Sequence, residues 1–253
     1  MSLNSKDPGI SKFAIPRIDE IINILVNSSF NSDLIFHGGD LSPATLFDAY
    51  RSGLFPMPLD DGKLGWFCPQ RRGILQILPQ IDGEFPFRVS RSLRNSIGKF
   101  TYSVDLAFRE VIANCADPQR PGTWITEEIK DAYTRLHELG WAHSFEVWKG
   151  DGENKDLVGG LYGVAIGGLF AGESMFHKQT DASKAALFVL VSKMADQGGA
   201  LIDLQWLTDH LASLGGKEIT GIEYLQMLED VISLPLPRIF KESYSGPVEI
   251  KLP

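Results

Sequence analysis

The chain has 253 residues, 43% of them hydrophobic and 22% charged, which is the composition of an ordinary globular protein. Its apolar runs all fall short of about 18 residues, the length that a membrane-spanning helix needs, and its first residues lack the basic and then apolar order of a secretory signal. These features predict a cytoplasmic protein. Cys68 and Cys115 show no CxxC or Cys/His spacing, so we expect neither a disulfide framework nor a bound metal.

The net charge of −8 conceals an uneven distribution. Residues 63–103 hold seven basic and two acidic side chains, a net charge of +5, so the rest of the chain carries −13. A protein that binds a polyanion with one face and a cationic partner with another would show this asymmetry, although a solvated helix face explains it equally well. The average charge therefore does not exclude a nucleic-acid partner.

Turn-forming residues dominate the first third of the chain. The glycines at 38–39 lead into a helix that Ser42 caps and Pro43 begins, and that ends at Gly53. Residues 55–69 are too rich in Pro, Gly and Asp for regular structure. Beyond them we expect a strand over 74–77, a short helix over 91–98 and a helix from Ser103 through Ile112.

Clearer patterning begins at Thr126, which caps a helix over 127–139. Three strands joined by turns at 150–154 and 167–168 predict an antiparallel meander. Asp181 caps the next helix, which ends at 198–199, and a capping box at Thr220 and Glu223 opens another. The expected strands of this half are 142–148, 157–166, 169–175 and, after the Asp181 helix, 200–205.

The order helix, meander, helix, strand is that of the GNAT-like N-acyltransferase fold, best known from acetyltransferases that use coenzyme A. We therefore expect an α+β protein with a small loop-rich N-terminal domain over 1–80 and a GNAT-like domain over 81–253. The second domain should hold a mostly antiparallel sheet flanked by helices. Many α+β domains share this order, and a fold by itself does not define a chemistry.

Polar residues interrupt two of the apolar strands. Asp203 and Gln205 stand two apart, so in a regular strand their side chains share one face while Ile202 and Leu204 face the other way. Glu173 follows Gly172 near the end of another core strand, where an acid is costly to bury without a partner. Catalysis is one interpretation of these residues; a satisfied hydrogen bond or a salt bridge at a strand end is the other.

Many segments of the chain resemble the leucyl/phenylalanyl-tRNA-protein transferase family. They run from about residue 38 to 225 in the family's order. The matching segments are 38–43 (GGDLSP), 53–56 (GLFP), 66–69 (WFCP), 89–93 (VSRSL), 123–126 (TWIT), 133–140 (YTRLHELG), 142–144 (AHS), 159–163 (GGLYG), 172–176 (GESMF), 180–184 (TDASK), 202–205 (IDLQ) and 210–215 (HLASLG). Phe67 and Cys68 depart from the family's usual Trp and Ser, and the turn over 150–155 is longer than usual.

The resemblance implies aminolysis of an ester: the N-terminal amine of a protein attacks the carbonyl that joins Leu, Phe or Met to the terminal ribose of tRNA. The acceptors would begin with Arg or Lys and be marked for N-degron degradation. No cofactor is implied, because the ester is already activated. Asp203 and Gln205 would form a relay in which the carboxylate polarises the amide, and Glu173 would hold the aminoacyl α-amine or the ribose.

The resemblance also implies substrate-binding residues, with plain core packing as the alternative for the apolar ones. Trp66 and Trp124 would stack on the terminal adenine of the aminoacyl-tRNA. The apolar pocket for the donor side chain would be formed by Leu161, Phe170, Gly172, Leu187, Leu190, Met194 and Ile202. The phosphates of the acceptor stem would be held, without reading of the sequence, by Arg71, Arg72, Arg88, Arg91, Arg94 and Lys99.

Two other functions fit parts of the sequence. A coenzyme A-dependent acetyltransferase needs a glycine-bearing turn before its central helix to hold a pyrophosphate, but residues 177–182 contain no glycine and place Asp181 there. A non-catalytic RNA-binding module would explain the basic stretch and the tryptophans. It gives no reason for Asp203, Gln205 and Glu173 to come together.

Overall fold

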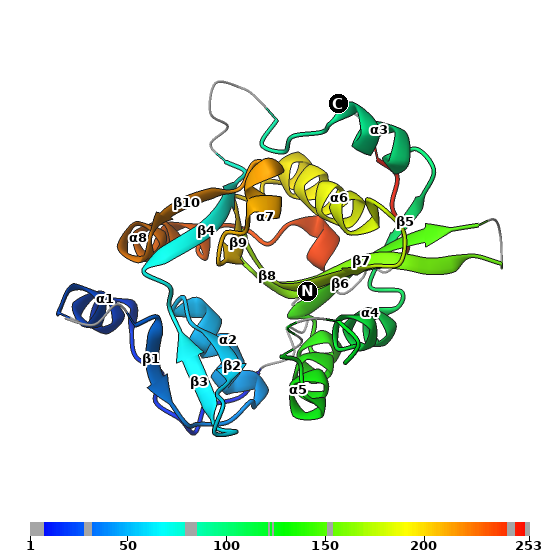
Figure 1. Ribbon diagram of the computed structural model, residues 1–253. Helices are drawn as coiled ribbons and strands as arrows, with labels where there is room; N and C mark the ends of the chain where they lie inside the picture. Colours follow the sequence, from blue (N-terminus) through cyan, green and yellow to red (C-terminus); the bar gives the residue numbers. More distant parts are fainter. Residues whose placement is uncertain are drawn as a thin grey trace, which may run out of the picture.

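The computed structural model describes residues 8–27, 32–78, 85–120, 122, 124–150, 154–241 and 246–250. These residues form two sheets (Figure 1). The small sheet has the order β1-β3-β2 and consists of β1 (Leu34–His37), β2 (Phe55–Pro58) and β3 (Leu64–Phe67). Beside it lie α1 (Ile18–Asn27) and α2 (Pro43–Arg51).

The large sheet has the order β10-β4-β9-β8-β7-β6-β5-β11 within the described residues. Its long central strands are β6 (Ala142–Lys149), β7 (Asp156–Ile166) and β8 (Leu169–His177). The shorter strands on either side are β4 (Arg71–Gln76), β5 (Thr101–Val104), β9 (Leu201–Gln205), β10 (Lys217–Thr220) and β11 (Gly246–Pro247). Every described pairing is antiparallel except that of β8 with β9.

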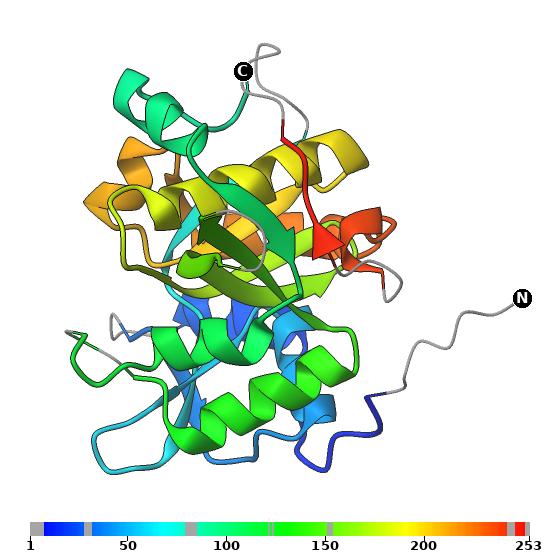
Figure 2. The same cartoon turned by 90° about the vertical axis from the view of Figure 1, so that its right-hand side faces the viewer.

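Helices cover both faces of the large sheet (Figures 1 and 2). One face carries α6 (Ala182–Gln197), with α3 (Arg91–Ile97) packed against it, and the other carries α4 (Phe108–Cys115) and α5 (Glu127–Glu138). The remaining helical segments are α7 (Asp209–Ser213), α8 (Gly221–Val231) and the 3₁₀ turn η1 (Arg238–Phe240). Among the described residues, none of the helices combines the length and apolar character needed to cross a bilayer.

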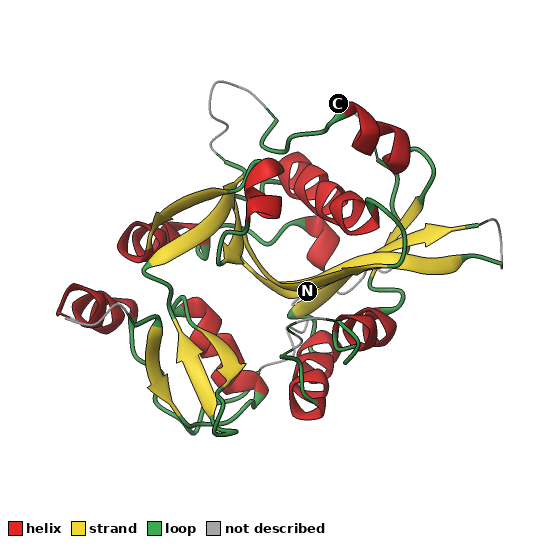
Figure 3. Cartoon of the chain, viewed as in Figure 1, coloured by secondary structure: helices red, strands yellow, loops and turns green. Residues whose placement is uncertain are grey.

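The predicted α+β class and the mostly antiparallel sheet are confirmed (Figure 3). The assignment to the N-acyltransferase fold in particular stays a prediction, as does the division of the chain at residue 80. Strand β4 lies before residue 80 but belongs to the large sheet. One apolar core also runs from Leu46 and Trp66 of the small sheet region to Tyr133 and Tyr162 of the large one.

Two predictions of local structure are wrong. Residues 55–69 were expected to be irregular, yet they contain β2 and β3, which pair Phe55 with Phe67 and Pro56 with Trp66. The prolines are tolerated because β2 is an edge strand, where a missing N–H breaks no inner ladder. The helix expected from Ser103 begins only at Phe108, because Ser103 pairs with Glu146 in β5 and Asp105 turns the chain with a φ of 58°.

The predicted helix caps are mostly confirmed. The side chains of Ser42, Thr126 and Thr220 each accept a backbone N–H in the first turn of their helix, and Thr220 forms the full capping box with Glu223. Asp181 occupies the cap position of α6, but only its backbone carbonyl accepts an N–H of that helix, from Ala185 at 2.8 Å; its side chain makes no cap hydrogen bond. The turn predicted over 150–154 falls partly on residues 151–153, which lie outside the described residues.

Gly163 allows two neighbouring strands to approach at a bulge in the β7–β8 ladder. A Cβ atom at this position would overlap the carbonyl oxygen of Ala171 and lie 2.5 Å from the ring of Phe170. Gly163→Ala should therefore lower the free energy of unfolding by about 1–3 kcal/mol, measured by denaturant titration. Gly98→Ala is the control, because its φ of −67° suits any residue and its nearest atom would be 4.0 Å away. Equal stability of the two variants would contradict this account of Gly163.

Candidate active site

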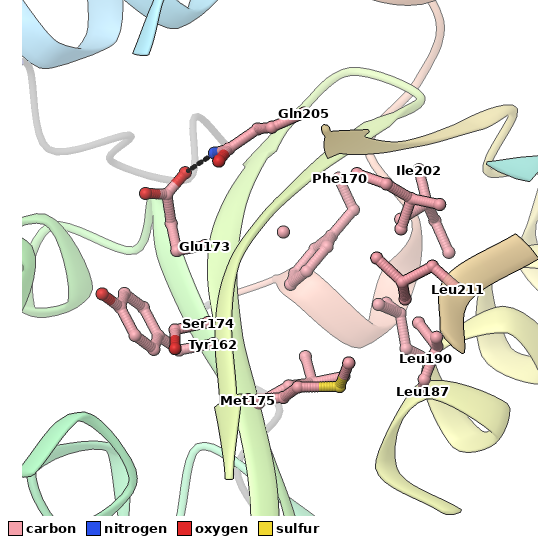
Figure 4. A pocket seen from close by; sticks show the side chains of 13 residues that line it. Tyr162, Phe170, Glu173, Ser174, Met175, Leu187, Leu190, Ile202, Gln205 and Leu211 are labelled. Carbon is pink, nitrogen blue, oxygen red and sulfur yellow. Dashed lines mark hydrogen bonds between the residues drawn. The ribbon is translucent and has the colours of Figure 1, made fainter. Parts of the chain in front are cut away.

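The parallel pairing of β8 with β9 is short. It joins Leu169 to Leu201 and ends where Ala171 meets Asp203, so the strands part beyond these residues. Glu173 and Gln205 lie next to this parting, and the Nε2 of Gln205 donates a hydrogen bond of 2.9 Å to Oε1 of Glu173 (Figure 4). These two polar side chains thus face one another where the pairing of β8 with β9 ends.

An apolar cavity of about 110 Å³ lies at the same opening. It has room for several water molecules, each of which needs roughly 10–15 Å³. The predicted pocket residues that line it are Leu161, Phe170, Gly172, Leu187, Leu190 and Ile202. Its wall also includes Met175, Leu204 and Leu211, which the sequence analysis did not select. Figure 4 shows Glu173 and Tyr162 on one side of the strands and Phe170, Ile202 and Leu211 on the other.

Glu173 is only 8% exposed and is held by hydroxyl groups as well as by Gln205. Tyr133 donates a hydrogen bond of 3.0 Å to its Oε2, and the hydroxyl of Tyr133 in turn contacts that of Tyr50. Burial raises the pKa of Glu173 to about 7, against the opposing effect of the tyrosine hydroxyls. A carboxyl group that changes charge near neutral pH therefore forms part of the lining of the cavity.

Asp203 forms a buried ion pair with Arg72. Arg72 donates to its two carboxylate oxygens from Nε at 2.8 Å and Nη2 at 2.5 Å, and both side chains are 1% exposed. Tyr224 donates to the same carboxylate at 3.0 Å. The guanidinium also donates to the carbonyl of Gly53 and lies over the rings of Phe55 and Tyr224. Both charges are thus paired and hydrogen-bonded, which burial requires.

The backbone at Gln205 departs from a regular strand. Gly73 pairs with Gln205 and Ile74 with Asp203, so Leu204 is an extra residue in β9, and Gln205 has a φ of 61°. The carboxylate of Asp203 accepts the backbone N–H of Gln205 at 2.9 Å. The expected contact between this carboxylate and the side-chain amide is therefore not found; Asp203 fixes the backbone of Gln205, and the amide of Gln205 binds Glu173.

The remaining predicted residues lie in several places. Trp66 is fully buried and donates to the carbonyl of Gly38, so it has no face for an adenine, and Met194 is buried outside the cavity lining. Trp124 is half-buried.

Among the predicted phosphate ligands, Arg72 is wrong, because its guanidinium is enclosed with Asp203. The side chains with solvent access are those of Arg71, Arg88, Arg91, Arg94 and Lys99.

Sequence reasoning missed the two tyrosines behind Glu173. Tyr133 lies in the matching segment 133–140 but was given no role, and Tyr50 was not singled out. The available signal was weak: both are tyrosines at positions of predicted helices, and a tyrosine hydroxyl that becomes buried usually needs a hydrogen-bonding partner. For Tyr133 this partner is the carboxyl group of Glu173, the acid whose place in an apolar strand the sequence did not explain.

The fold and the site define an α+β protein in which a buried carboxyl group and a buried amide face one another in the lining of an apolar cavity. The model of the family described as leucyl/phenylalanyl-tRNA protein transferase matches residues 83–229, and the model of that family's N-terminal domain matches residues 39–70. The chain belongs to the leucyl/phenylalanyl-tRNA-protein transferase family.

Relatives similar along most of the chain bear the name leucyl/phenylalanyl-tRNA–protein transferase. The protein from Dechloromonas aromatica strain RCB is 47% identical over 212 residues, 81% of this chain and 85% of its own. The protein from Enterobacter sp. strain 638 is 46% identical over 209 residues, 82% of this chain and 85% of its own. That from Shewanella woodyi is 44% identical over 207 residues, 80% and 83% of the two chains.

The raised pKa of Glu173 predicts a pH-dependent stability. Between its ordinary pKa of 4.5 and about 7 the native protein binds the proton more tightly than the unfolded chain. The free energy of unfolding should therefore fall through this window as the pH rises, by about 3 kcal/mol, and level off above pH 7. Denaturant titrations of Glu173→Gln from pH 4.5 to 8 should show a much smaller fall, which remains because burial also raises the pKa of Glu146. Glu229→Gln, an exposed residue of α8, should retain the whole fall; an undiminished fall in Glu173→Gln would refute the assignment.

Proposed function

We propose that the protein transfers leucine, phenylalanine or methionine from aminoacyl-tRNA to the N-terminal amine of proteins that begin with Arg or Lys, and so marks them for N-degron degradation. The observation that carries the proposal is the apolar cavity that opens between Glu173 and Gln205, in a chain of this family. Such a cavity suits an apolar side chain that is not branched at Cβ, held by an ester beside Glu173 and Gln205. The proposed reaction takes place in the cytoplasm, where charged tRNA is made.

The reaction forms a bond between the amine nitrogen and the ester carbonyl carbon and breaks the bond from that carbon to the ribose oxygen. The amine loses a proton, and the departing ribose oxygen gains one. Because Nε2 of Gln205 donates to Glu173, the oxygen of the same amide is the atom suited to accept an N–H of the attacking amine. Gln205 would thereby orient the amine towards the carbonyl.

Glu173 is suited to the proton transfer or to binding the aminoacyl α-amine. A carboxyl group with a pKa of about 7 is a competent proton acceptor near neutral pH, whereas an ordinary exposed carboxylate is a much weaker base. The hydroxyl of Tyr133 fixes the carboxyl from behind. Asp203 would act through the backbone of Gln205, which it holds by the hydrogen bond to its N–H.

Exposed basic residues near α3 would contact the phosphates of the acceptor stem. Arg91 and Arg94 lie on α3, with Arg88 before it and Lys99 after it, and α3 packs against α6 above the large sheet (Figure 1). These contacts would position the tRNA without reading its sequence. Arg71 is also exposed but is paired with Glu218. Trp124, half-buried just before α5, remains the proposed partner of the terminal adenine.

Coenzyme A-dependent chemistry is disfavoured by the start of α6. The carboxylate of Asp181 lies there, where it accepts hydrogen bonds of 2.9 Å from Ser96 and 2.8 Å from Lys184. A pyrophosphate bound at this helix terminus would meet that negative charge. The donor of the acyl group is therefore better sought in the ester of a charged tRNA.

The central test is transfer of radiolabelled leucine from Leu-tRNA to a model protein that begins with Arg. We expect transfer without coenzyme A or ATP. Gln205→Ala should lower kcat about 100-fold, because the oriented amide is lost, and Asp203→Asn should lower it less. Asp209→Ala, an exposed residue of α7, is the control and should leave the rate unchanged. Dependence on acetyl-coenzyme A, or failure with every charged tRNA, would refute the proposal.

The cavity itself can be tested by filling it. Leu211 is half-buried on α7 and lines the cavity, so Leu211→Trp should occupy the space of the donor side chain. The KM for Leu-tRNA should rise about tenfold, since an apolar side chain of this size gains roughly 1.5–3 kcal/mol on burial. His210→Trp places the same ring on an exposed neighbour and should leave the KM unchanged. Equal KM values in both variants would show that the donor side chain binds elsewhere.

A further inference from the structure

An exposed indole follows directly after Gln205. Trp206 is 37% exposed, whereas Gln205 before it is 8% exposed and lines the cavity. Large apolar side chains are usually buried, because burial stabilises the fold. An exposed one next to a site therefore indicates a surface that binds a ligand. Trp206 does not line the donor pocket, and it is not one of the basic residues around α3 that are proposed to bind phosphate.

The indole of Trp206 is held in one orientation by the small sheet. Its Nε1 donates a hydrogen bond of 2.9 Å to Oδ2 of Asp33, and its ring meets those of Phe55 and Phe67 at centroid distances of 5.0 and 6.0 Å. The interplanar angles of 90° and 66° are those of edge contacts. A ring fixed in this way loses little conformational entropy when a ligand packs on it.

Asp33 supplies a negative charge beside the ring. Its Oδ1 accepts the backbone N–H of Gln70 at 2.9 Å and its Oδ2 accepts the indole N–H, so the carboxylate is oriented. In the described part of the chain no Lys or Arg nitrogen lies within 4.0 Å of this carboxylate. The neighbouring Arg71 is paired with Glu218 instead. The charge of Asp33 is therefore available to a ligand.

An aromatic face next to an unpaired carboxylate is a binding site for an organic cation, since the ring quadrupole and the carboxylate both attract positive charge. We propose that Trp206 and Asp33 bind the cationic side chain of the first residue of the acceptor protein. The inference rests on the proposed function, which places the acceptor amine at Gln205. Adjacent residues of a chain lie only about 3.8 Å apart between Cα atoms, so a Lys or Arg side chain spans the distance from Gln205 to Trp206 easily.

The arrangement separates the two substrates. The donor side chain enters the cavity under α6 and α7, and the proposed phosphate contacts lie near α3, on the same side of the large sheet (Figure 1). Asp33, Phe55 and Phe67 belong to the small sheet region, on the opposite side. Acceptor and donor would thus approach the Glu173–Gln205 pair from different directions.

The test compares peptides that begin with Arg and with citrulline, its uncharged isostere, as acceptors of labelled leucine from Leu-tRNA. The unaltered protein should show the lower KM for the Arg peptide. Asp33→Asn and Trp206→Leu should each raise that KM about tenfold and leave the KM for the citrulline peptide, the KM for Leu-tRNA and the kcat unchanged. Trp206→Phe keeps a ring and should have a smaller effect. Asp60→Asn, an exposed acid of the same small sheet region, is the control.

Thermal unfolding of each variant shows whether a change is specific, and Asp33→Asn retains the size of the side chain if Trp206→Leu fails to fold. An unchanged KM for the Arg peptide in Asp33→Asn and Trp206→Phe would overturn the inference. A rise in the KM for Leu-tRNA alone would overturn it too, and would assign the indole to the terminal adenine. If the unaltered protein transfers leucine to neither peptide, the proposed function fails, and the inference fails with it.

Discussion

The buried pair of Arg72 and Asp203 is the interaction on which the site depends. It joins β4 to β9, and the same guanidinium reaches back to the carbonyl of Gly53 after α2. Removing one partner of such a pair leaves an uncompensated charge in the interior, which typically costs about 3–5 kcal/mol. Buried ion pairs often add little net stability compared with an apolar replacement, but this one fixes the relative geometry of β4 and β9.

A sequence of contacts leads from this pair to the proposed reaction site at Gln205 and Glu173. The carboxylate of Asp203 holds the backbone of Gln205 in a left-handed conformation that non-glycine residues adopt only at some cost. The bulge at Leu204 then lets the amide of Gln205 turn towards Glu173 on the neighbouring strand. Tyr133 completes the constraint from α5. The two carboxyl oxygens of Glu173 on β8 are thus held by residues of two other elements, Gln205 of β9 and Tyr133 of α5.

The sequence predicted most helices and strands from Thr126 onward, and the acids and the amide of the site, but not their contacts. Capping residues such as Thr126 and Thr220 act locally, so their helices could be located from spacing alone. The role of Arg72 could not be predicted from spacing, because its partner Asp203 is 131 positions away. The basic stretch around Arg72 indicated a solvated surface instead. The burial of Trp66 could not be predicted for a related reason. It results from the pairing of β3 with β1 and β2, and the many turn-forming residues of 55–69 gave no indication of these strands.

The strands β8 and β9 separate within the sheet, where their backbone pairing ends, and not at a loop. A recess walled by strands and a long helix exists before any substrate arrives, so entry of the donor requires little ordering of the chain. Capture of the charged tRNA would then proceed at a rate set by diffusion and by electrostatic attraction to its phosphates. Discrimination among amino acids would arise afterwards, from the time each side chain stays in the recess before it leaves.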